Sequence, residues 1–246
     1  MLKDSAMLKD KIIVALDVPT KEDALAIVEE LGDSVGAYKI GMQLYNACGP
    51  EILQAVYARN GQVFLDLKFH DIPNTVASAS RTVAKLGVFM FNLHASGGYT
   101  MMAEAAKALK EEAAKLGVEK PLLIAVTVLT SMGQEELKNE VGVEREIGAQ
   151  VVALAKLAKE AGLDGVVASP LEIKMIREAC GSDFLIVTPG IRPREAGSDD
   201  QKRIKTPGEA VSDGADYLVI GRPITKAPDR AAAVKSIVAE IEASVK

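Results

Sequence analysis

The chain has 246 residues, of which 48% are hydrophobic and 26% are charged, and its formal net charge is -5. This composition excludes a mainly disordered chain, and the length suits either one large α/β barrel or two ordinary domains. The negative charge disfavours nucleic acid and anionic lipid as partners, and no apolar run approaches the roughly 20 residues that a membrane helix needs.

Short apolar runs rich in β-branched residues alternate with longer Ala/Glu/Lys/Leu segments of helical period along the chain. The apolar runs predict strands at residues 12–17, 37–41, 63–68, 89–94, 122–128, 165–168, 185–188 and 217–221. Continuous apolar runs, such as residues 12–16, indicate parallel strands that are covered on both faces. About eight such units in about 250 residues is the count of a (β/α)8 TIM barrel. A doubly wound open sheet is the alternative, since the number of units does not prove closure.

No Pro/Gly/Ser-rich linker divides the sequence, so we predict a single domain over residues 1–246. Residues 1–10 are expected to form a short N-terminal extension, in which Met-Leu-Lys-Asp occurs at residues 1–4 and again at residues 7–10. Two stretches depart from the βα rhythm, residues 130–142 and the polar residues 192–206. Loops of that length in a compact domain are usually functional.

Charged side chains gather where the predicted strands end. In a TIM barrel the active-site groups stand at the carboxyl ends of the strands and in the loops that follow. The polar side chains at such positions are Asp17, Lys39, Asp66, Lys68, His94, Arg192 and Arg222. Acids and lysines from neighbouring strands attract one another, so the pattern predicts a network of ion pairs at the barrel mouth. Such a network is either a stabilising rim or a catalytic group.

The densest cluster lies in residues 66–73, at the end of the third predicted strand. The period of a strand points Asp66 and Lys68 to one face, and Leu67 and Phe69 to the other. Asp71 follows the strand, before an Ile-Pro pair that imposes an extended or turn conformation. Its carboxylate is therefore free either to fold back or to reach elsewhere.

A lysine among carboxylates suits a particular kind of chemistry. Neighbouring negative charge favours the ammonium form, so we expect Lys68 to be protonated at neutral pH and a poor nucleophile. A lysine that forms a Schiff base needs an apolar or cationic environment instead. Lys68 is therefore predicted to act as a general acid and as a fixed positive charge.

Two glycine-arginine segments predict a phosphate site. Residues 188–192 (Thr-Pro-Gly-Ile-Arg) follow the seventh predicted strand, and residues 220–222 (Ile-Gly-Arg) end the eighth. Barrels commonly bind phosphate at these two places through backbone N–H groups, and arginine adds a bidentate fork. The alternative is that Gly190 and Gly221 only form tight turns and that the arginines are solvated.

Metal and nucleotide-cofactor chemistry lack support in the sequence. His70 and His94 are the only histidines and do not form a recognisable metal motif. Neither a GxGxxG nor a P-loop motif is present. Cys48 and Cys180 lack CxxC spacing and the start has no signal-peptide core, so we expect reduced cysteines and a cytoplasmic protein.

The motifs together resemble one enzyme family. They are Ala15-Leu16-Asp17, Tyr38-Lys39-Ile40-Gly41-Met42, residues 64–73, Asn92-Leu93-His94-Ala95, Leu129-Thr130-Ser131, residues 188–192 and Val219-Ile220-Gly221-Arg222. In this order they are similar to the bacterial orotidine 5'-monophosphate decarboxylases, from Asp17 to Arg222. The resemblance implies a homodimeric TIM barrel that converts orotidine 5'-monophosphate to uridine 5'-monophosphate in pyrimidine synthesis, without a metal or organic cofactor.

The resemblance also implies a role for each matching residue. Lys68 would protonate carbon 6 of the pyrimidine as carbon dioxide leaves, with Asp66 and Lys39 in its charge network. Asp71 and Thr75 would enter the site of the neighbouring subunit. The remaining substrate contacts would be Asp17 and Lys39 at the ribose, Thr130 at the pyrimidine, Gln201 between base and phosphate, and Pro189, Arg192, Gly221 and Arg222 around the phosphate.

The implied chemistry agrees with the reading of the charges. Loss of carbon dioxide leaves a carbanion at a ring carbon without a conjugated electron sink, so placed charge must stabilise it. Asp66 would either repel the substrate carboxylate or orient Lys68, and the sequence leaves both open. Phosphate binding would help to close the loop of residues 192–206 over the site.

Two other functions are compatible with parts of the pattern. Metal-dependent sugar-phosphate decarboxylases and aldolases of the same superfamily share the Asp-x-Lys-x-x-Asp pattern, but tend to have a glutamate where this chain has Lys39, and a cation there would repel Mg²⁺. A non-catalytic barrel that binds a phosphorylated ligand would keep Arg192 and Arg222 without requiring Lys68. The intact charged cluster favours the decarboxylase over both.

Overall fold

The computed structural model describes residues 8–193 and 204–245. Its parallel strands hydrogen-bond in sequence order around a closed barrel, and β8 returns to pair with β1. The strands are β1 (Ile12–Ala15), β2 (Ala37–Gly41), β3 (Val63–Phe69), β4 (Met90–His94), β5 (Leu122–Val126), β6 (Gly165–Val167), β7 (Leu185–Thr188) and β8 (Tyr217–Ile220). The prediction of a TIM barrel is confirmed, and the open sheet is excluded.

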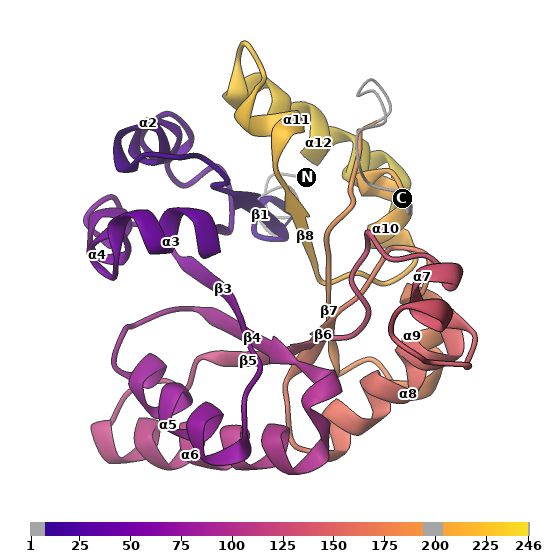
Figure 1. Cartoon of the computed structure of the whole chain (residues 1–246). Coiled ribbons are helices and arrows are strands. Elements are labelled where there is room, and N and C mark those ends of the chain that lie inside the picture. The colour runs from indigo at the N-terminus through magenta and orange to yellow at the C-terminus, as the bar shows by residue number, and fades with distance from the viewer. Residues whose placement is uncertain (1–7, 194–203, 246) are drawn as a thin grey trace.

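Helices surround the strands, as the view along the barrel in Figure 1 shows. They are α2 (Lys21–Leu31), α3 (Met42–Cys48), α4 (Glu51–Tyr57), α5 (Pro73–Ala84), α6 (Gly98–Leu116), α7 (Gln134–Asn139), α8 (Ile147–Glu160), α9 (Ile173–Cys180), α10 (Pro207–Ser212), α11 (Arg222–Thr225) and α12 (Arg230–Ser244), with a short 3-10 helix at Ala95–Gly97. No helix among the described residues combines the length and the apolar character needed to cross a membrane.

The core has two parts because side chains alternate along each strand. On β1, Ile13 and Ala15 belong to a small apolar cluster, whereas Ile12 and Val14 belong to a much larger one that includes the helices. The small cluster therefore fills the barrel interior, and the large one lies between strands and helices. All four residues of β1 are buried, as expected for strands covered on both faces.

The helix after β3 begins in a way that keeps Asp71 apart from it. Pro73 is the first residue of α5, where its missing N–H costs no helical hydrogen bond, and Ile72 precedes the helix in an extended conformation. Asp71 therefore lies between the strand and the helix, in an exposed turn.

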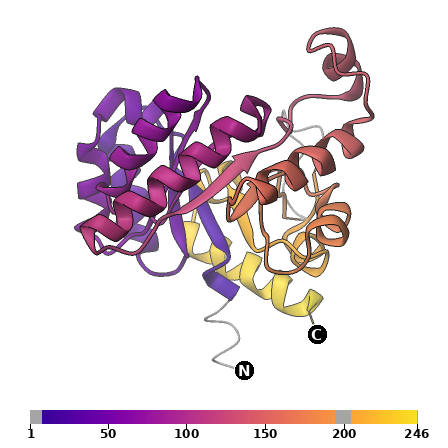
Figure 2. The same cartoon turned by 90° about the horizontal axis from the view of Figure 1, so that it is seen from below.

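The loop predicted at residues 130–142 contains a helix, so that part of the prediction is wrong. Residues 134–139 form α7, and the Glu136 carboxylate accepts a hydrogen bond from the N–H of Gly133 at 3.0 Å. This short helix follows β5, and in Figure 2 its segment projects beyond the barrel end to which the β5 arrow points. In the second predicted loop, Ile191 pairs with Lys205, and residues 194–203 lie outside the described residues. So do residues 1–7, with the first copy of the repeated Met-Leu-Lys-Asp.

Candidate functional site

Four charges of alternating sign form a row across the carboxyl ends of β1, β2 and β3. The Lys39 ammonium lies 3.0 Å from Asp17 Oδ1 and 3.2 Å from Asp66 Oδ2. The other oxygen of Asp66, Oδ1, lies 2.6 Å from the Lys68 ammonium. The predicted network of ion pairs at the barrel mouth is therefore present, and it links Asp17, Lys39, Asp66 and Lys68 in that order.

The exposed fraction of these four side chains increases from the centre of the row of charges to its ends. The side chains of Lys39 and Asp66 are only 11% and 10% exposed, whereas those of Lys68 and Asp17 are 26% and 61% exposed. Burial alone would raise the pKa of Asp66, but Lys39, Lys68 and hydrogen bonds from Lys68 and Asn92 outweigh it and hold that pKa below its usual value. Burial likewise opposes the charge on Lys39, yet Asp66 and Asp17 raise its pKa. Asp66 and Lys39, at the centre of this row of charges, are therefore both ionised.

Asn92, which occurs in one of the sequence motifs but had no predicted role, joins this network from β4. Its side-chain amide donates to Asp66 Oδ1 at 2.7 Å and accepts from the backbone N–H of Lys68 at 2.9 Å. Asn92 is 2% exposed. The available signal was its position two residues after Met90, which fills the barrel interior, because the same strand period then points Asn92 inward toward the mouth.

A small cavity of about 170 Å³ opens beside Lys68. Its polar wall consists of Lys39, Asp66, Lys68, Asn92 and Thr130, and its apolar wall includes Phe64, Val126, Val128, Val167 and Val219. One side of the cavity therefore presents placed charges and the other presents aliphatic and aromatic surface. This arrangement suits a flat, partly polar ring whose reacting atom faces Lys68.

A second cavity of about 570 Å³ adjoins the first and shares Lys39, Pro189 and Val219 with it. Its wall includes Asp17, Gly190, Arg192, Gly221 and Arg222, so both predicted glycine-arginine segments meet here. Gly190 has a left-handed φ of 77°, which favours glycine and turns the chain after β7 toward Arg192. The two arginines suit an anion. The two cavities together can hold a ring at one end and a phosphate at the other.

Two predicted site residues of the same chain stay away from this network. Asp71 and Thr75 are exposed, and among the described residues the Asp71 carboxylate accepts one hydrogen bond, from the N–H of Ile72 at 2.6 Å. The carboxylate of Asp71 does not fold back onto Lys68. Gln201 lies outside the described residues.

The two histidines lie side by side at the rim, with ring centroids 5.3 Å apart. Burial, His70 and Lys68 lower the pKa of His94, and Asp66 opposes that effect. Within the described part of the chain, no group of three or more His, Cys, Asp and Glu side chains could hold a metal ion. Both cysteines are free.

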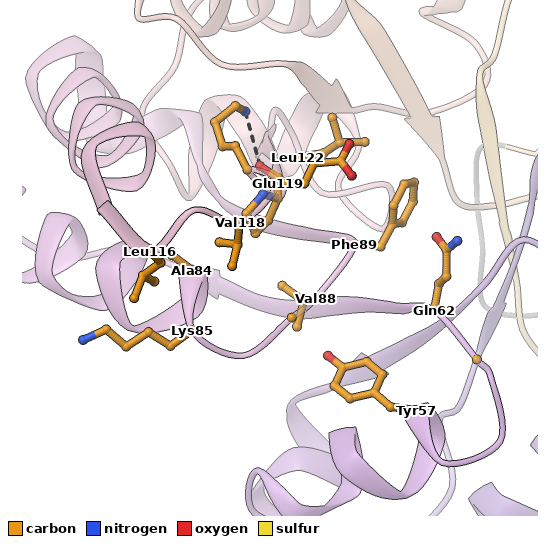
Figure 3. Close-up of a pocket in the computed structure, with 14 residues that line it drawn as sticks. Tyr57, Gln62, Ala84, Lys85, Val88, Phe89, Leu116, Val118, Glu119 and Leu122 are labelled. Atoms are coloured by element: carbon orange, nitrogen blue, oxygen red, sulfur yellow. Dashed lines mark hydrogen bonds between the residues drawn. The ribbon is translucent and has the colours of Figure 1, made fainter. Parts of the chain in front are cut away.

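A further cavity, of about 800 Å³ and larger than either of the cavities at the carboxyl ends, lies at the opposite end of the barrel, and Figure 3 shows residues that line it. Gln62, Phe89 and Leu122, which line it, stand at the amino ends of β3, β4 and β5. Two polar groups of its wall already bond within the protein, because Tyr57 donates to the Leu86 carbonyl and Lys120 pairs with Asp164. The smaller cavities at the carboxyl ends therefore remain the candidate site.

We expect Asp66→Asn to lower the free energy of unfolding at pH 7 by about 3 kcal/mol, the usual cost when a buried ion pair loses one partner. The lowered pKa of Asp66 means that its charge stabilises the fold fully above the ordinary carboxyl pKa of about 3.9. That stability is lost as the pH falls through the lowered pKa. Denaturant unfolding over a pH series should therefore show that the free energies of unfolding of the wild type and Asp66→Asn converge at acid pH.

The matched control for this series is Asp33→Asn. The Asp33 carboxylate is 96% exposed and pairs with Lys9 at 3.5 Å, so its loss should change the stability little. A difference between wild type and Asp66→Asn that stays constant down to the acid transition would contradict the assigned ion pairs.

Comparison with known proteins identifies relatives along nearly the whole chain. A model of the family described as "Orotidine 5'-phosphate decarboxylase / HUMPS family" matches residues 10–237. The chain is 57% identical over 234 residues to orotidine 5'-phosphate decarboxylase of Moorella thermoacetica, covering 95% of this chain and 93% of that protein. It is 56% identical over 245 residues to the protein of the same name from Trichlorobacter lovleyi, with 100% of both covered. A crystal structure of orotidine 5'-phosphate decarboxylase from Lactobacillus acidophilus matches with a TM-score of 0.82 at 41% identity, covering 94% of this chain and 98% of that one.

Proposed function

Because this chain belongs to the orotidine 5'-phosphate decarboxylase / HUMPS family, we propose that it converts orotidine 5'-monophosphate to uridine 5'-monophosphate in pyrimidine biosynthesis. The observation that carries this proposal is the Lys68 ammonium, held 2.6 Å from Asp66 at the wall of a ring-sized cavity. The adjoining cavity with Arg192 and Arg222 supports a phosphorylated substrate.

The proposed substrate lies across both cavities. Its pyrimidine occupies the smaller one, next to Lys68 and Thr130. Its ribose lies near Asp17 and Lys39, which line the larger cavity together with Pro189. Its phosphate is held by Arg192, Gly221 and Arg222. The resemblance assigns the bridge between base and phosphate to Gln201, which lies outside the described residues.

The proposed step breaks the bond between carbon 6 and the carboxylate. Carbon dioxide leaves, and the electron pair of the broken bond stays on carbon 6. The Lys68 ammonium stabilises this carbanion by its charge and then transfers a proton to it, which gives uridine 5'-monophosphate and a neutral lysine. Solvent returns the proton to Lys68. No metal or organic cofactor takes part in this proposal.

Asp66 serves the step through its position between two ammonium groups. Its lowered pKa keeps it anionic, and each of its oxygens contacts a different lysine. We propose that it orients Lys68, because the 2.6 Å contact fixes the ammonium beside the cavity. Lys39 in turn holds the second oxygen of Asp66 and keeps the carboxylate from rotating.

We further propose that the active protein is a homodimer with shared sites. Asp71 and Thr75 are exposed on the turn and first helical residues after β3, and they do not approach the network of their own chain. Ile72 between them is 67% exposed, an apolar side chain that a second subunit would cover. Asp71 and Thr75 of each subunit would complete the site of the other.

The position of Lys39 favours this reaction over a metal-dependent one. A divalent cation at Asp66 would need oxygen ligands, and the place beside Asp66 Oδ2 is taken by an ammonium 3.2 Å away. The Lys39 ammonium would repel a divalent cation placed there. A lysine in this place instead fits a site that stabilises developing negative charge.

The test is a decarboxylation assay with chelator-treated protein. Purified protein incubated with EDTA should still consume orotidine 5'-monophosphate, followed by the loss of its ultraviolet absorbance. The matched assay without chelator should show the same rate. A rate that disappears with EDTA and returns with Mg²⁺ would favour the metal-dependent alternative, and no turnover in either assay would favour a phosphate-binding barrel without catalysis.

A further inference from the structure

The end of β3 departs from regular pairing at the two charged residues of the site. Leu65 pairs with Phe91 and Phe69 pairs with Leu93, so four residue steps on β3 (65 to 69) oppose two steps on β4 (91 to 93). The extra residues form a bulge that includes Asp66 and Lys68. Bulges re-aim side chains and are common beside active sites.

The backbone of Lys68 is left-handed within this bulge, with a φ of 53°. A long side chain rarely adopts this conformation, which costs free energy and persists only where neighbouring groups impose it. Lys68 shares this left-handed conformation with Asn60, whose residue type tolerates it better. The residue that carries the proposed proton is therefore held in an unfavourable backbone conformation.

Asn92 supplies the groups that can impose this conformation. It lies on β4 between Phe91 and Leu93, directly opposite the bulge. Its Oδ1 accepts from the Lys68 N–H at 2.9 Å, so a side chain and not a ladder carbonyl satisfies this backbone donor. Its Nδ2 donates to Asp66 Oδ1 at 2.7 Å, the same oxygen that the Lys68 ammonium contacts at 2.6 Å.

An asparagine is well suited to this place. A carboxamide presents one acceptor and one donor group at a fixed separation, whereas aspartate presents only acceptors and leucine presents neither. If Asn92 served only to satisfy buried polar groups, its partners could be any polar groups nearby. Both bonds of Asn92 go to the residue that moves the proton and to its counter-charge, and Asn92 itself lines the small cavity.

We propose that Asn92 is a positioning residue, which locks Lys68 in its left-handed conformation and fixes Asp66 so that the ammonium is aimed at the reacting carbon. This inference rests on the proposed decarboxylation. Without the amide, the Lys68 N–H loses its acceptor and the bulge can relax toward extended backbone. A displacement of the ammonium by about 1 Å can lower a rate by about 100-fold.

Two variants separate the two bonds. Asn92→Leu has a similar size and removes both, so kcat should fall roughly 100-fold, while KM changes little because the arginines and the ribose contacts remain. Asn92→Asp keeps an acceptor for the Lys68 N–H but places a second carboxylate beside Asp66. Its kcat should lie between those of the wild type and Asn92→Leu. Crystal structures of both ligand-free variants give the φ of Lys68, which should leave the left-handed region in Asn92→Leu and stay in it in Asn92→Asp.

Ser80→Ala is the control for lost stability. Ser80 is fully buried and donates to the Val76 carbonyl of its own helix at 2.8 Å, so its loss should lower stability without lowering kcat. Wild-type kcat in Asn92→Leu, or a Lys68 that keeps its left-handed φ and its contact with Asp66 there, would overturn the inference while leaving the proposed function intact. A wild-type protein that does not decarboxylate orotidine 5'-monophosphate would instead defeat the proposed function, and the φ of Lys68 in Asn92→Leu and Asn92→Asp would still decide whether Asn92 holds it. If Asn92→Leu does not fold, a φ of Lys68 that leaves the left-handed region in Asn92→Asp would count against the inference.

Discussion

Lys68→Ala should lower kcat for orotidine 5'-monophosphate by roughly 10⁴-fold or more, because in the proposed mechanism it removes both the general acid and the placed charge that stabilises the carbanion. The fold should survive, since the Lys68 side chain is 26% exposed and stands at the rim of the barrel. Steady-state rates from the absorbance change, together with circular dichroism of the variant, measure both effects. Lys68→Arg, which keeps the charge but holds its proton more firmly, should recover only part of the loss.

The matched control is Lys85→Ala. Lys85 also pairs with a carboxylate, Glu112 at 3.3 Å, but it lines the cavity at the amino ends of the strands. Its removal should leave kcat unchanged. Retention of more than a tenth of the wild-type kcat in Lys68→Ala would contradict the role assigned to the ammonium.

A mixed dimer of Lys68→Ala and Asp71→Ala subunits should recover about half of the wild-type activity. The activity of each parent homodimer should be lower than that of the wild type by roughly 100-fold or more. The reason is the proposed sharing of sites. One site of the mixed dimer then lacks both residues, and the other combines an intact Lys68 with an intact Asp71 from the neighbouring subunit. Isolation through two different affinity tags gives the mixed dimer for the assay.

The control for this experiment is a mixed dimer of Lys68→Ala and Asp66→Ala subunits. Lys68 and Asp66 contact each other within one chain at 2.6 Å, so neither site of that dimer is complete and no recovery is expected. An inactive dimer of Lys68→Ala with Asp71→Ala subunits, verified as mixed, would place both residues in the same site of one chain. Asp71 would then have to approach Lys68 by a change in the turn before Pro73.

The barrel could be predicted from sequence because each strand is a short, continuous apolar run. The predicted bounds of β2 and β7 agree with the structure, and the other predicted strands differ from the observed ones by up to two residues at an end. The number of units favoured closure but did not prove it, since closure depends on the pairing of β8 with β1 across the whole chain. The helix α7 was missed because its six residues carry a single buried side chain, that of Leu137, and hence no apolar period.

The charged site was predictable to the extent that strand ends converge in a barrel. This rule brought Asp17, Lys39, Asp66 and Lys68 together correctly. The expectation that a regular strand puts Asp66 and Lys68 on one face was right in its result but not in its cause, because a bulge intervenes. A bulge depends on pairing with β4, so neither the left-handed Lys68 nor the role that we propose for Asn92 follows from local sequence.

The most direct test of the proposed role of Lys68 is a crystal structure of the protein with an analogue of uridine 5'-monophosphate. The proposed mechanism requires carbon 6 of the pyrimidine within about 3.5 Å of the Lys68 nitrogen, the separation of reacting atoms poised for transfer, and the phosphate at Arg192 and Arg222. A ring bound with carbon 6 turned away from Lys68, and with another proton donor beside that carbon, would contradict it.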